Sequence, residues 1–435
     1  MILSQTMPTQ SVTLTSITTD KFKTGTLIFS VNIPNDKLFS PYSLLLTEVL
    51  QRATASFPTK AILQKHLDEL YSTTVSIRCA KHGKSRAYTF SAEILDNCYS
   101  DGEIDIALEA AKVLYELIYN PLLDNDGYFF EQSVEQEKRR TANYLRSTKN
   151  NPARYASTRL SELLLRDDES ASTLEEMLET VENCDRYKLT EFYKSTLACR
   201  PINVFYIGTL SHSEISNKVM SFLNTHSALH IDSPMSPKPI EARKEIAKKD
   251  ESMPISQGRL AIGFTSDGCI ADENYYALTL FNEIFGGGPS SKLFMNVREK
   301  MSLCYSCSSL YNVFDGTIRV SAGISPQNRD IAQKAILKEF ENIKKGKISH
   351  KELISAKKAI ENSYREIYDN PADILGFYLV RHALGIDVTI DECREKFSKL
   401  TIDDVVSVAN KAKLDSVYFL CGDADDGEQE EAYDE

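Results

Sequence analysis

The residues best suited to chemistry are an arginine and a tyrosine in the second half of the chain. Arg298 lies in a stretch with helical apolar spacing, and Tyr305 follows seven residues later, where a strand-like stretch begins. A guanidinium and a phenol hydroxyl delivered to one place can donate hydrogen bonds to a peptide carbonyl or to an oxyanion. Taken by themselves, the two residues are better explained as ordinary surface residues.

A glycine-rich run, Gly286-Gly287-Gly288, precedes this stretch. Backbone N–H groups of such a run can bind a phosphate in front of a helix. The spacing here matches neither the P-loop nor the dinucleotide-binding pattern, and the run follows a predicted helix and not a strand. The sequence therefore predicts a flexible turn between two helices, with Ser290 or Ser291 capping the second.

Cysteines and histidines do not form a usual metal site. Cys304 and Cys307 form a C-x-x-C, but a structural zinc site needs a second pair, and strand residues three apart should point to opposite faces. His226 and His230 are four residues apart, with no third ligand or general base beside them. We interpret the cysteines as buried thiols and the histidines as surface residues.

Composition narrows the class of protein. The chain has 435 residues, with 50 Lys+Arg against 62 Asp+Glu, a formal net charge of −12. This acidity disfavours nucleic acid as a partner, because binding phosphates requires a cationic surface. Nine scattered cysteines favour a reducing compartment. No signal peptide and no run of ~18 apolar residues is found, so we expect a cytoplasmic protein that makes no membrane contact.

The stretches that must position these residues occur twice along the chain. Glu48 and Tyr71 are 23 residues apart, and Glu283 and Tyr305 are 22 apart. The other matches, in the same order in both halves, are 42–50 with 276–285, 91–94 with 321–324, 151–153 with 370–372, 188–190 with 399–401, and 204–208 with 417–422. Because the repeat is over 200 residues long, it indicates a duplicated domain and not a solenoid.

Each half has the same order of predicted elements. A strand (24–32; 258–265) precedes a helix (41–55; 273–285), then β-rich stretches, long helices and a last strand. This order predicts an α+β fold of two homologous halves, each a mostly antiparallel sheet flanked by helices. The predicted parts are an N-terminal half (1–230), a proline-rich linker (231–256), a C-terminal half (257–422) and an acidic, disordered tail (423–435).

Residues 286–306 resemble a known family signature. They are similar to the pattern GGGxSSxLFxxxREKxxLxY in the C-terminal half of the pitrilysin/insulysin/mitochondrial-processing-peptidase zinc peptidases. The resemblance extends over about residues 15–422 and implies two halves that enclose part of a chamber for short or unfolded peptides. It also implies that Arg298 and Tyr305 bind substrate and steady the oxyanion, and that the glycine run is a substrate-gating turn.

The sequence departs from this family at the metal. The family carries H-x-x-E-H on the first long helix, where residues 45–49 here read Leu-Leu-Thr-Glu-Val. Both ligand positions, Leu45 and Val49, are apolar, and Glu48 stands at the position of the general base. The third-ligand region keeps Glu135 and Glu137. Because a catalytic zinc has three protein ligands, we expect no metal in this chain and no peptidase activity from it alone.

The resemblance therefore implies the subunit of a bacterial two-chain pair that lacks the zinc motif. An H-x-x-E-H homologue would hold the zinc, and this chain would bind peptide and supply Arg298 and Tyr305 to the partner's site. Two alternatives remain. One is a peptidase-like scaffold or maturation factor without a proteolytic role. The other is an active enzyme with an unorthodox metal site at His66 or His82.

Overall fold

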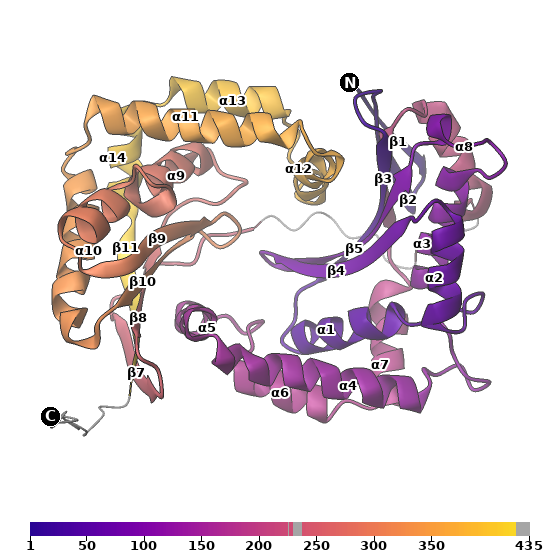
Figure 1. Ribbon diagram of the computed structural model, residues 1–435, viewed down its shortest axis with the longest axis horizontal. Helices are drawn as coiled ribbons and strands as arrows, with labels where there is room; N and C mark the ends of the chain where they lie inside the picture. Colours follow the sequence, from indigo (N-terminus) through magenta and orange to yellow (C-terminus); the bar gives the residue numbers. More distant parts are fainter. Residues whose placement is uncertain (225, 229–236, 423–435) are drawn as a thin grey trace, which may run out of the picture. The chain divides into compact units, whose positions relative to one another are not determined.

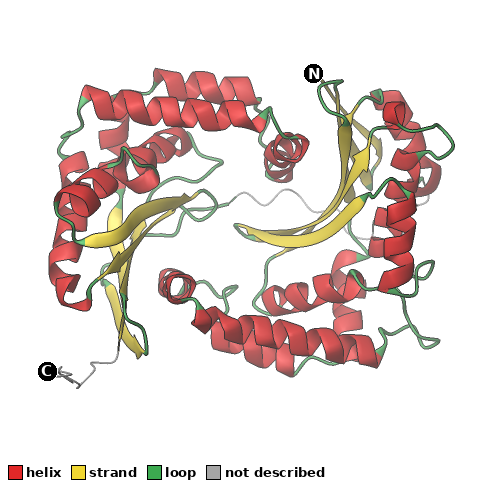
Figure 2. Cartoon of the chain, in the orientation of Figure 1, coloured by secondary structure: helices red, strands yellow, loops and turns green. Residues whose placement is uncertain are grey.

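The computed structural model describes residues 1–224, 226–228 and 237–422. These residues form two compact units. Unit 1 contains Met1–Arg146, Glu169–Pro237 and Arg365–Ile390, and unit 2 contains Ser147–Asp168, Lys238–Tyr364 and the described residues from Asp391 onward. Each unit contains one sheet flanked by helices (Figure 2), which confirms the predicted α+β class. The acidic tail and part of the predicted linker lie outside the described residues.

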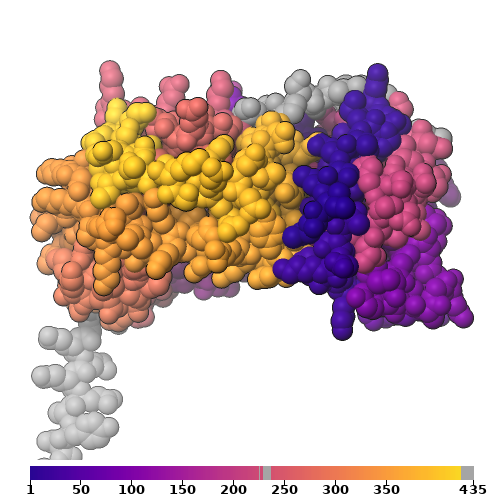
Figure 3. Space-filling model, turned by 90° about the horizontal axis from the view of Figure 1, so that it is seen from above, coloured from indigo at the N-terminus to yellow at the C-terminus, as the bar shows by residue number. Residues whose placement is uncertain are grey.

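The sheet of unit 1 has the strand order β1-β2-β6-β3-β5-β4. Its strands are β1 Ile2–Thr9, β2 Val12–Thr18, β3 Thr24–Pro34, β4 Thr74–His82, β5 Ser85–Leu95 and β6 Ile202–Gly208. All neighbours pair antiparallel except β2 and β6. β3 is apolar along most of its length because both of its faces are covered, whereas the edge strand β1 is exposed at the surface (Figure 3).

The sheet of unit 2 has the order β7-β11-β8-β10-β9. Its strands are β7 Ala247–Met253, β8 Gly258–Thr265, β9 Cys304–Asn312, β10 Thr317–Ile324 and β11 Lys413–Gly422. Here too one pair is parallel, β11 with β7, and the rest are antiparallel. β7 lies within the segment predicted as linker. Its charged sequence lacks the apolar alternation that predicts a strand. β7 pairs with β11 on one side and forms the edge of the sheet on the other.

Helices flank both sheets, some packing on the strands and others on neighbouring helices (Figure 1). Those of unit 1 are α1 Phe39–Leu50, α2 Lys60–Glu69, α3 Ile106–Tyr119, α4 Glu131–Arg146, α6 Leu174–Glu182, α7 Arg186–Phe192, α8 His212–Leu223 and α12 Pro371–Ala383. Those lying wholly or mainly in unit 2 are α5 Pro152–Leu164, α9 Asn274–Asn282, α10 Arg329–Lys344, α11 His350–Ile367, α13 Ile390–Lys399 and α14 Ile402–Lys411.

One helix of each half belongs to the unit of the other half. α5, from the first half of the sequence, packs on β8 and β11 of unit 2, and α12, from the second half, packs on β3 and β6 of unit 1. Both helices start with the duplicated Asn-Pro-Ala. Asn151 and Asn370 accept hydrogen bonds from backbone N–H groups of the first turn, and proline follows at the first helical position. The repeat therefore marks the start of both exchanged helices.

The two exchanged helices both bury apolar side chains but differ in their polar contacts. On unit 1, Ile374, Leu375 and Leu379 of α12 pack with apolar residues of the sheet in one buried cluster. On unit 2, the Tyr155 hydroxyl of α5 donates to Glu251 of β7 over 2.9 Å, and Arg159 pairs with the same carboxylate over 3.1 Å. α5 also buries Ala156, Leu160 and Leu164, so its difference from α12 is the added ion pair with Glu251.

Candidate functional site

Helix α1 carries the degenerate zinc motif. It forms because Leu45, Leu46, Val49 and Leu50 recur at helical spacing and enter the core of unit 1. Leu45 and Val49 are buried, whereas Glu48 is exposed. The two positions that would carry imidazoles therefore serve as core positions. The helix was predicted to reach residue 55, but it ends at Leu50.

Facing this helix is one carboxylate of α4. Glu137, whose side chain is only 2% exposed, accepts a hydrogen bond from Nη1 of Arg52 and another from Nη1 of Arg140, over 3.1 Å. Glu135, the residue chosen from the sequence, pairs instead with Lys138 on its own helix. Sequence reasoning missed Arg52, whose only signal is its spacing of four residues from Glu48.

These residues do not fit a zinc ion. Two of the three family ligand positions are buried hydrocarbon, and the third-ligand region offers Glu137, which is already paired with a guanidinium. In the described part of the chain, no three His, Cys, Asp or Glu residues come together as a metal site would require. Around α1, what remains is the Glu137 carboxylate with its two guanidinium partners and one exposed carboxylate, that of Glu48.

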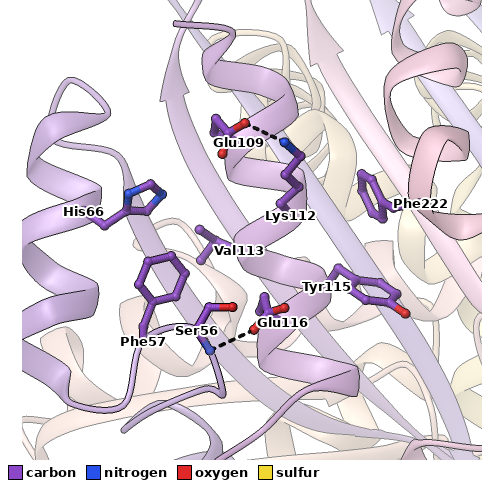
Figure 4. A pocket seen from close by; sticks show the side chains of 9 residues that line it. All are labelled: Ser56, Phe57, His66, Glu109, Lys112, Val113, Tyr115, Glu116 and Phe222. Atoms are coloured by element: carbon purple, nitrogen blue, oxygen red, sulfur yellow. Dashed lines mark hydrogen bonds and ion pairs between the residues drawn. The ribbon is translucent and has the colours of Figure 1, made fainter.

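His66 and His82, the alternative metal ligands, lie elsewhere in unit 1. His66 stacks on Phe57 with ring centroids 4.7 Å apart, and both line a separate cavity of about 380 Å³ with Glu109 and Glu116 of α3 (Figure 4). His82, at the end of β4, is buried, and this burial lowers its pKa. Neither histidine lines the cavity that contains Glu48.

Arg298 and Tyr305 come together in unit 2. Arg298 lies on a π-helical segment, Leu293–Lys300, that is anchored by the buried side chains of Leu293 and Val297. Tyr305 is the second residue of β9, and 68% of its surface is exposed. Both residues line one open cavity of about 410 Å³. The structure therefore brings together the two side chains that the sequence singled out.

Two neighbouring side chains contact the guanidinium group of Arg298. Its guanidinium lies 4.5 Å from the centroid of the Phe294 ring, and its Nε is 3.6 Å from the carboxylate of Glu299. Among the described residues, no hydrogen-bond partner is found for Nη1 or Nη2 of Arg298, or for the Tyr305 hydroxyl. These donors are available to an oxygen that carries negative charge.

A β-bulge gives Tyr305 its position and corrects one prediction. Cys304 pairs with Ile324 and Ser306 with Gly323, so Tyr305 is an extra residue in β9. The bulge resets the alternation, and Cys304 and Cys307 are both buried instead of pointing to opposite faces. A hydrogen bond between the two thiols lowers the pKa of Cys304 and, together with burial, raises that of Cys307.

The glycine run closes a second π-helical turn, Glu283–Gly287, just before this segment. A side chain on Gly286 would lie 2.6 Å from the backbone nitrogen of Ser309, so only glycine lets the turn approach β9. Gly286 is thus buried and not part of an open loop, although the turn does separate two helical segments as predicted. As predicted, Ser291 accepts a hydrogen bond at the start of the next segment, from the Phe294 N–H.

Of the two histidines that are four residues apart, the structure describes only His226, which lies beyond the end of a helix. α8 ends at Leu223, and the imidazole of His226 lies 3.1 Å from the backbone oxygen of Arg200. His226 is half-buried, and this burial lowers its pKa. His230 lies outside the described residues. His226 was predicted to be a surface residue; the structure makes it half-buried, because its ring packs on Tyr119 and lies within hydrogen-bond distance of the Arg200 backbone.

Comparison with known proteins identifies the family. The family model described as "Peptidase M16 inactive domain" matches residues 183–360. A Bacillus subtilis protein described as a probable inactive metalloprotease, YmfF, is 30% identical over 413 residues, which are 93% of this chain and 95% of that protein. The chain belongs to the M16 peptidase family. This confirms the family resemblance of residues 286–306, and the degenerate motif on α1 agrees with an inactive M16 member.

Solved structures share the M16 fold over the whole chain. A conserved protein from Enterococcus faecalis has a TM-score of 0.88 at 26% identity, covering 98% of this chain and 100% of its own. A peptidase M16 inactive domain from Pseudomonas fluorescens has a TM-score of 0.79 at 18% identity, with 97% and 99% covered. Among the described helices of this M16 chain, none is both long and apolar enough to span a bilayer.

Proposed function

We propose that this M16 chain is the non-catalytic, peptide-binding subunit of a two-chain zinc peptidase. A homologous partner with an intact H-x-x-E-H motif holds the zinc, and this chain supplies Arg298 and Tyr305 to that partner's site. The observation that carries the proposal is the contrast within the chain. The metal positions of α1 are filled by core side chains, whereas Arg298 and Tyr305 share an open cavity with unused donors.

The chemistry follows from the donors. Attack of water on a peptide carbonyl turns its oxygen into an oxyanion, which is stabilised by donors already aimed at it. A guanidinium stays charged at any physiological pH, and a phenol hydroxyl donates one further hydrogen bond. Neither group can activate the water, so the general base and the metal must come from the partner. The substrate class is short or unfolded peptides.

The test is to co-express this chain with each H-x-x-E-H homologue of the same genome and to purify through a tag on this chain. We expect a stoichiometric complex that contains one zinc and cleaves a quenched peptide library. Arg298→Ala should abolish most of that cleavage without releasing the partner. Lys300→Ala, at an exposed position of the same π-helical segment, should leave the cleavage rate unchanged.

A chain that purifies alone and metal-free, and that changes no homologue's activity, would overturn the proposal and favour a scaffold or maturation factor. The proposal includes a cytoplasmic location. This is supported by the nine cysteines, all of which are free thiols in the structure, as expected in a reducing compartment.

A further inference from the structure

One cavity of unit 1 takes no part in the function proposed above. It is lined by residues of α2, α3 and α8 and of the segment that precedes α2 (Figure 4). Its volume of about 380 Å³ lies within the range of sites that bind small molecules, roughly 300–1,000 Å³. Such sites combine an apolar lining with a few polar groups, and this cavity has both.

Aromatic rings form two walls of this cavity. On one side, the imidazole of His66 stacks on the Phe57 ring, with centroids 4.7 Å apart and an angle of 28° between the planes. On the other side, Tyr115 and Phe222 meet edge to face, with centroids 5.4 Å apart. The buried side chain of Val113 lies between the two pairs (Figure 4). All four rings are only partly buried, so part of each ring surface is available to a ligand.

The carboxylates of the cavity differ in their partners. Glu109 pairs with Lys112 one turn along α3, with 2.7 Å between the carboxylate oxygen and Nζ. Glu116 accepts hydrogen bonds from the Ser56 backbone N–H, over 3.3 Å, and from the Asn120 side-chain amide, over 2.8 Å, and both donors are neutral. Among the described residues, no lysine, arginine or histidine forms an ion pair with Glu116. The cavity therefore has one carboxylate whose charge is not balanced by a cation.

A carboxylate without a cation, beside aromatic rings, suits an organic cation. A ring face attracts a cation electrostatically, and the attraction is larger where water is partly excluded. A metal ion does not suit the cavity, because no three His, Cys, Asp or Glu residues of the described chain come together to hold one. We infer that this cavity binds an ammonium or guanidinium group carried on an apolar body. Glu116 pairs with the charged group, and Phe57, Tyr115 and Phe222 cover the apolar body.

Two sources present this chemistry, namely a free amine and the lysine or arginine side chain of a peptide. The inference concerns unit 1 alone. It does not rest on the proposed function, because this cavity shares no lining residue with the cavity of Arg298 and Tyr305. Binding of a cation here and cleavage by a two-chain complex can therefore fail separately.

The first experiment titrates the full chain at pH 8, where imidazole is normally neutral, with phenethylamine and with phenethyl alcohol, a neutral molecule of similar shape. Methyl NMR of isotope-labelled valine reports binding through the signal of Val113, which lines the cavity. We expect phenethylamine to shift this signal and to bind at least tenfold more tightly than the alcohol, because only the amine can pair with Glu116. Equal affinities, or no shift of the Val113 signal, would overturn the inference.

Variants then test the residues that make the site. Glu116→Gln keeps the shape of the side chain and removes its charge, so it should reduce the preference for the amine to less than twofold. Glu69→Gln, on α2 but outside the cavity, is the control and should keep the affinity within twofold. Phe222→Leu should weaken amine binding roughly threefold, as expected for the loss of one cation–π contact. An unchanged preference in Glu116→Gln would overturn the inference.

Two blocked tripeptides distinguish the sources of the cation, acetyl-Ala-Arg-Ala-amide and its neutral counterpart acetyl-Ala-Gln-Ala-amide. If the arginine peptide binds more tightly than phenethylamine, the natural ligand is a peptide side chain, and the reverse order assigns the site to a free amine. Both results support the inference. Failure of both cations to bind would overturn it.

Discussion

The two units treat the same duplicated framework in opposite ways. The segment around Glu48 matches the segment around Glu283 in the repeat. In unit 1 this carboxylate is exposed beside ligand positions filled by Leu45 and Val49, and the nearby charge of Glu137 is neutralised internally. In unit 2, Glu283 is half-buried, and burial raises its pKa, while the donors of the following segment stay open to solvent.

This difference shows that buried and exposed positions of a site differ in what their substitution requires of the rest of the fold. Buried positions must be filled with well-packed side chains, and a buried charge must be paired, because unpaired buried charges are costly. Exposed hydrogen-bond donors carry no such cost, because water can satisfy them. The comparison therefore shows a chain whose former ligand positions on α1 are packed with apolar side chains, whereas the donors of unit 2 remain open. Four predictions test it.

The largest expected effect is at a former ligand position. Leu45 is fully buried, so Leu45→Ala should lower the free energy of unfolding by about 3 kcal/mol through lost burial and the cavity left behind. Leu310→Ala on β9, where 66% of the leucine surface is exposed, is the control and should change it by less than about 0.5 kcal/mol. Denaturant titration measures both. Equal values would show that the ligand position is not a core position.

The next effect concerns the retained donors of unit 2. Tyr305→Phe removes only the hydroxyl, and peptide cleavage by the complex should fall by about 100-fold, as when one oxyanion donor is deleted. Ser308→Ala, an exposed position three residues further along β9, should leave the rate within twofold. The unfolding midpoint should not change in either variant. An unaffected rate in Tyr305→Phe would remove the tyrosine from the proposed site.

A smaller effect separates the two exchanged helices by pH. Burial lowers the pKa of His382 on α12, so the folded state binds fewer protons than the unfolded state below about pH 6.5, and stability is lost as the pH falls. On α5 the partner is Glu251. Burial would raise the pKa of Glu251, but the hydrogen bonds from Lys249 and Tyr155 lower it to about 2, so it stays charged throughout this range.

Acidification from pH 7.5 to 5.5 should therefore loosen α12 and not α5, which amide hydrogen exchange can resolve helix by helix. His382→Gln should reduce the pH dependence of the unfolding free energy by at most about 1.4 kcal/mol per pH unit, the limit for one proton. Similar protection of both helices at pH 5.5 would contradict the difference in their attachment.

The smallest effect is expected at the remaining residue of the motif. Glu48 is exposed and the fit to zinc is absent, so Glu48→Gln should change peptide cleavage by the complex less than twofold and unfolding by less than about 0.5 kcal/mol. Steady-state cleavage and denaturant titration check both values. A large loss of cleavage would show that this chain provides a general base after all.

Residue identity and periodicity were enough to predict the duplication, the α+β class, and the main strands and helices. These features depend on residues within one segment, since a helix such as α1 or a strand such as β8 is specified by its own apolar spacing. The signature of residues 286–306 was also sufficient to indicate the family, because side chains at fixed spacing identify it directly.

Only the tertiary structure decided which distant segments meet. It exchanged α5 and α12 between the units, and it added the charged strand β7 to a sheet. It also chose Glu137 over Glu135 and paired it with Arg52, 85 residues away along the chain. Such contacts depend on long-range pairing and on which face of a helix is covered. Spacing within a single segment cannot specify them, because the partner that completes each contact lies elsewhere in the chain.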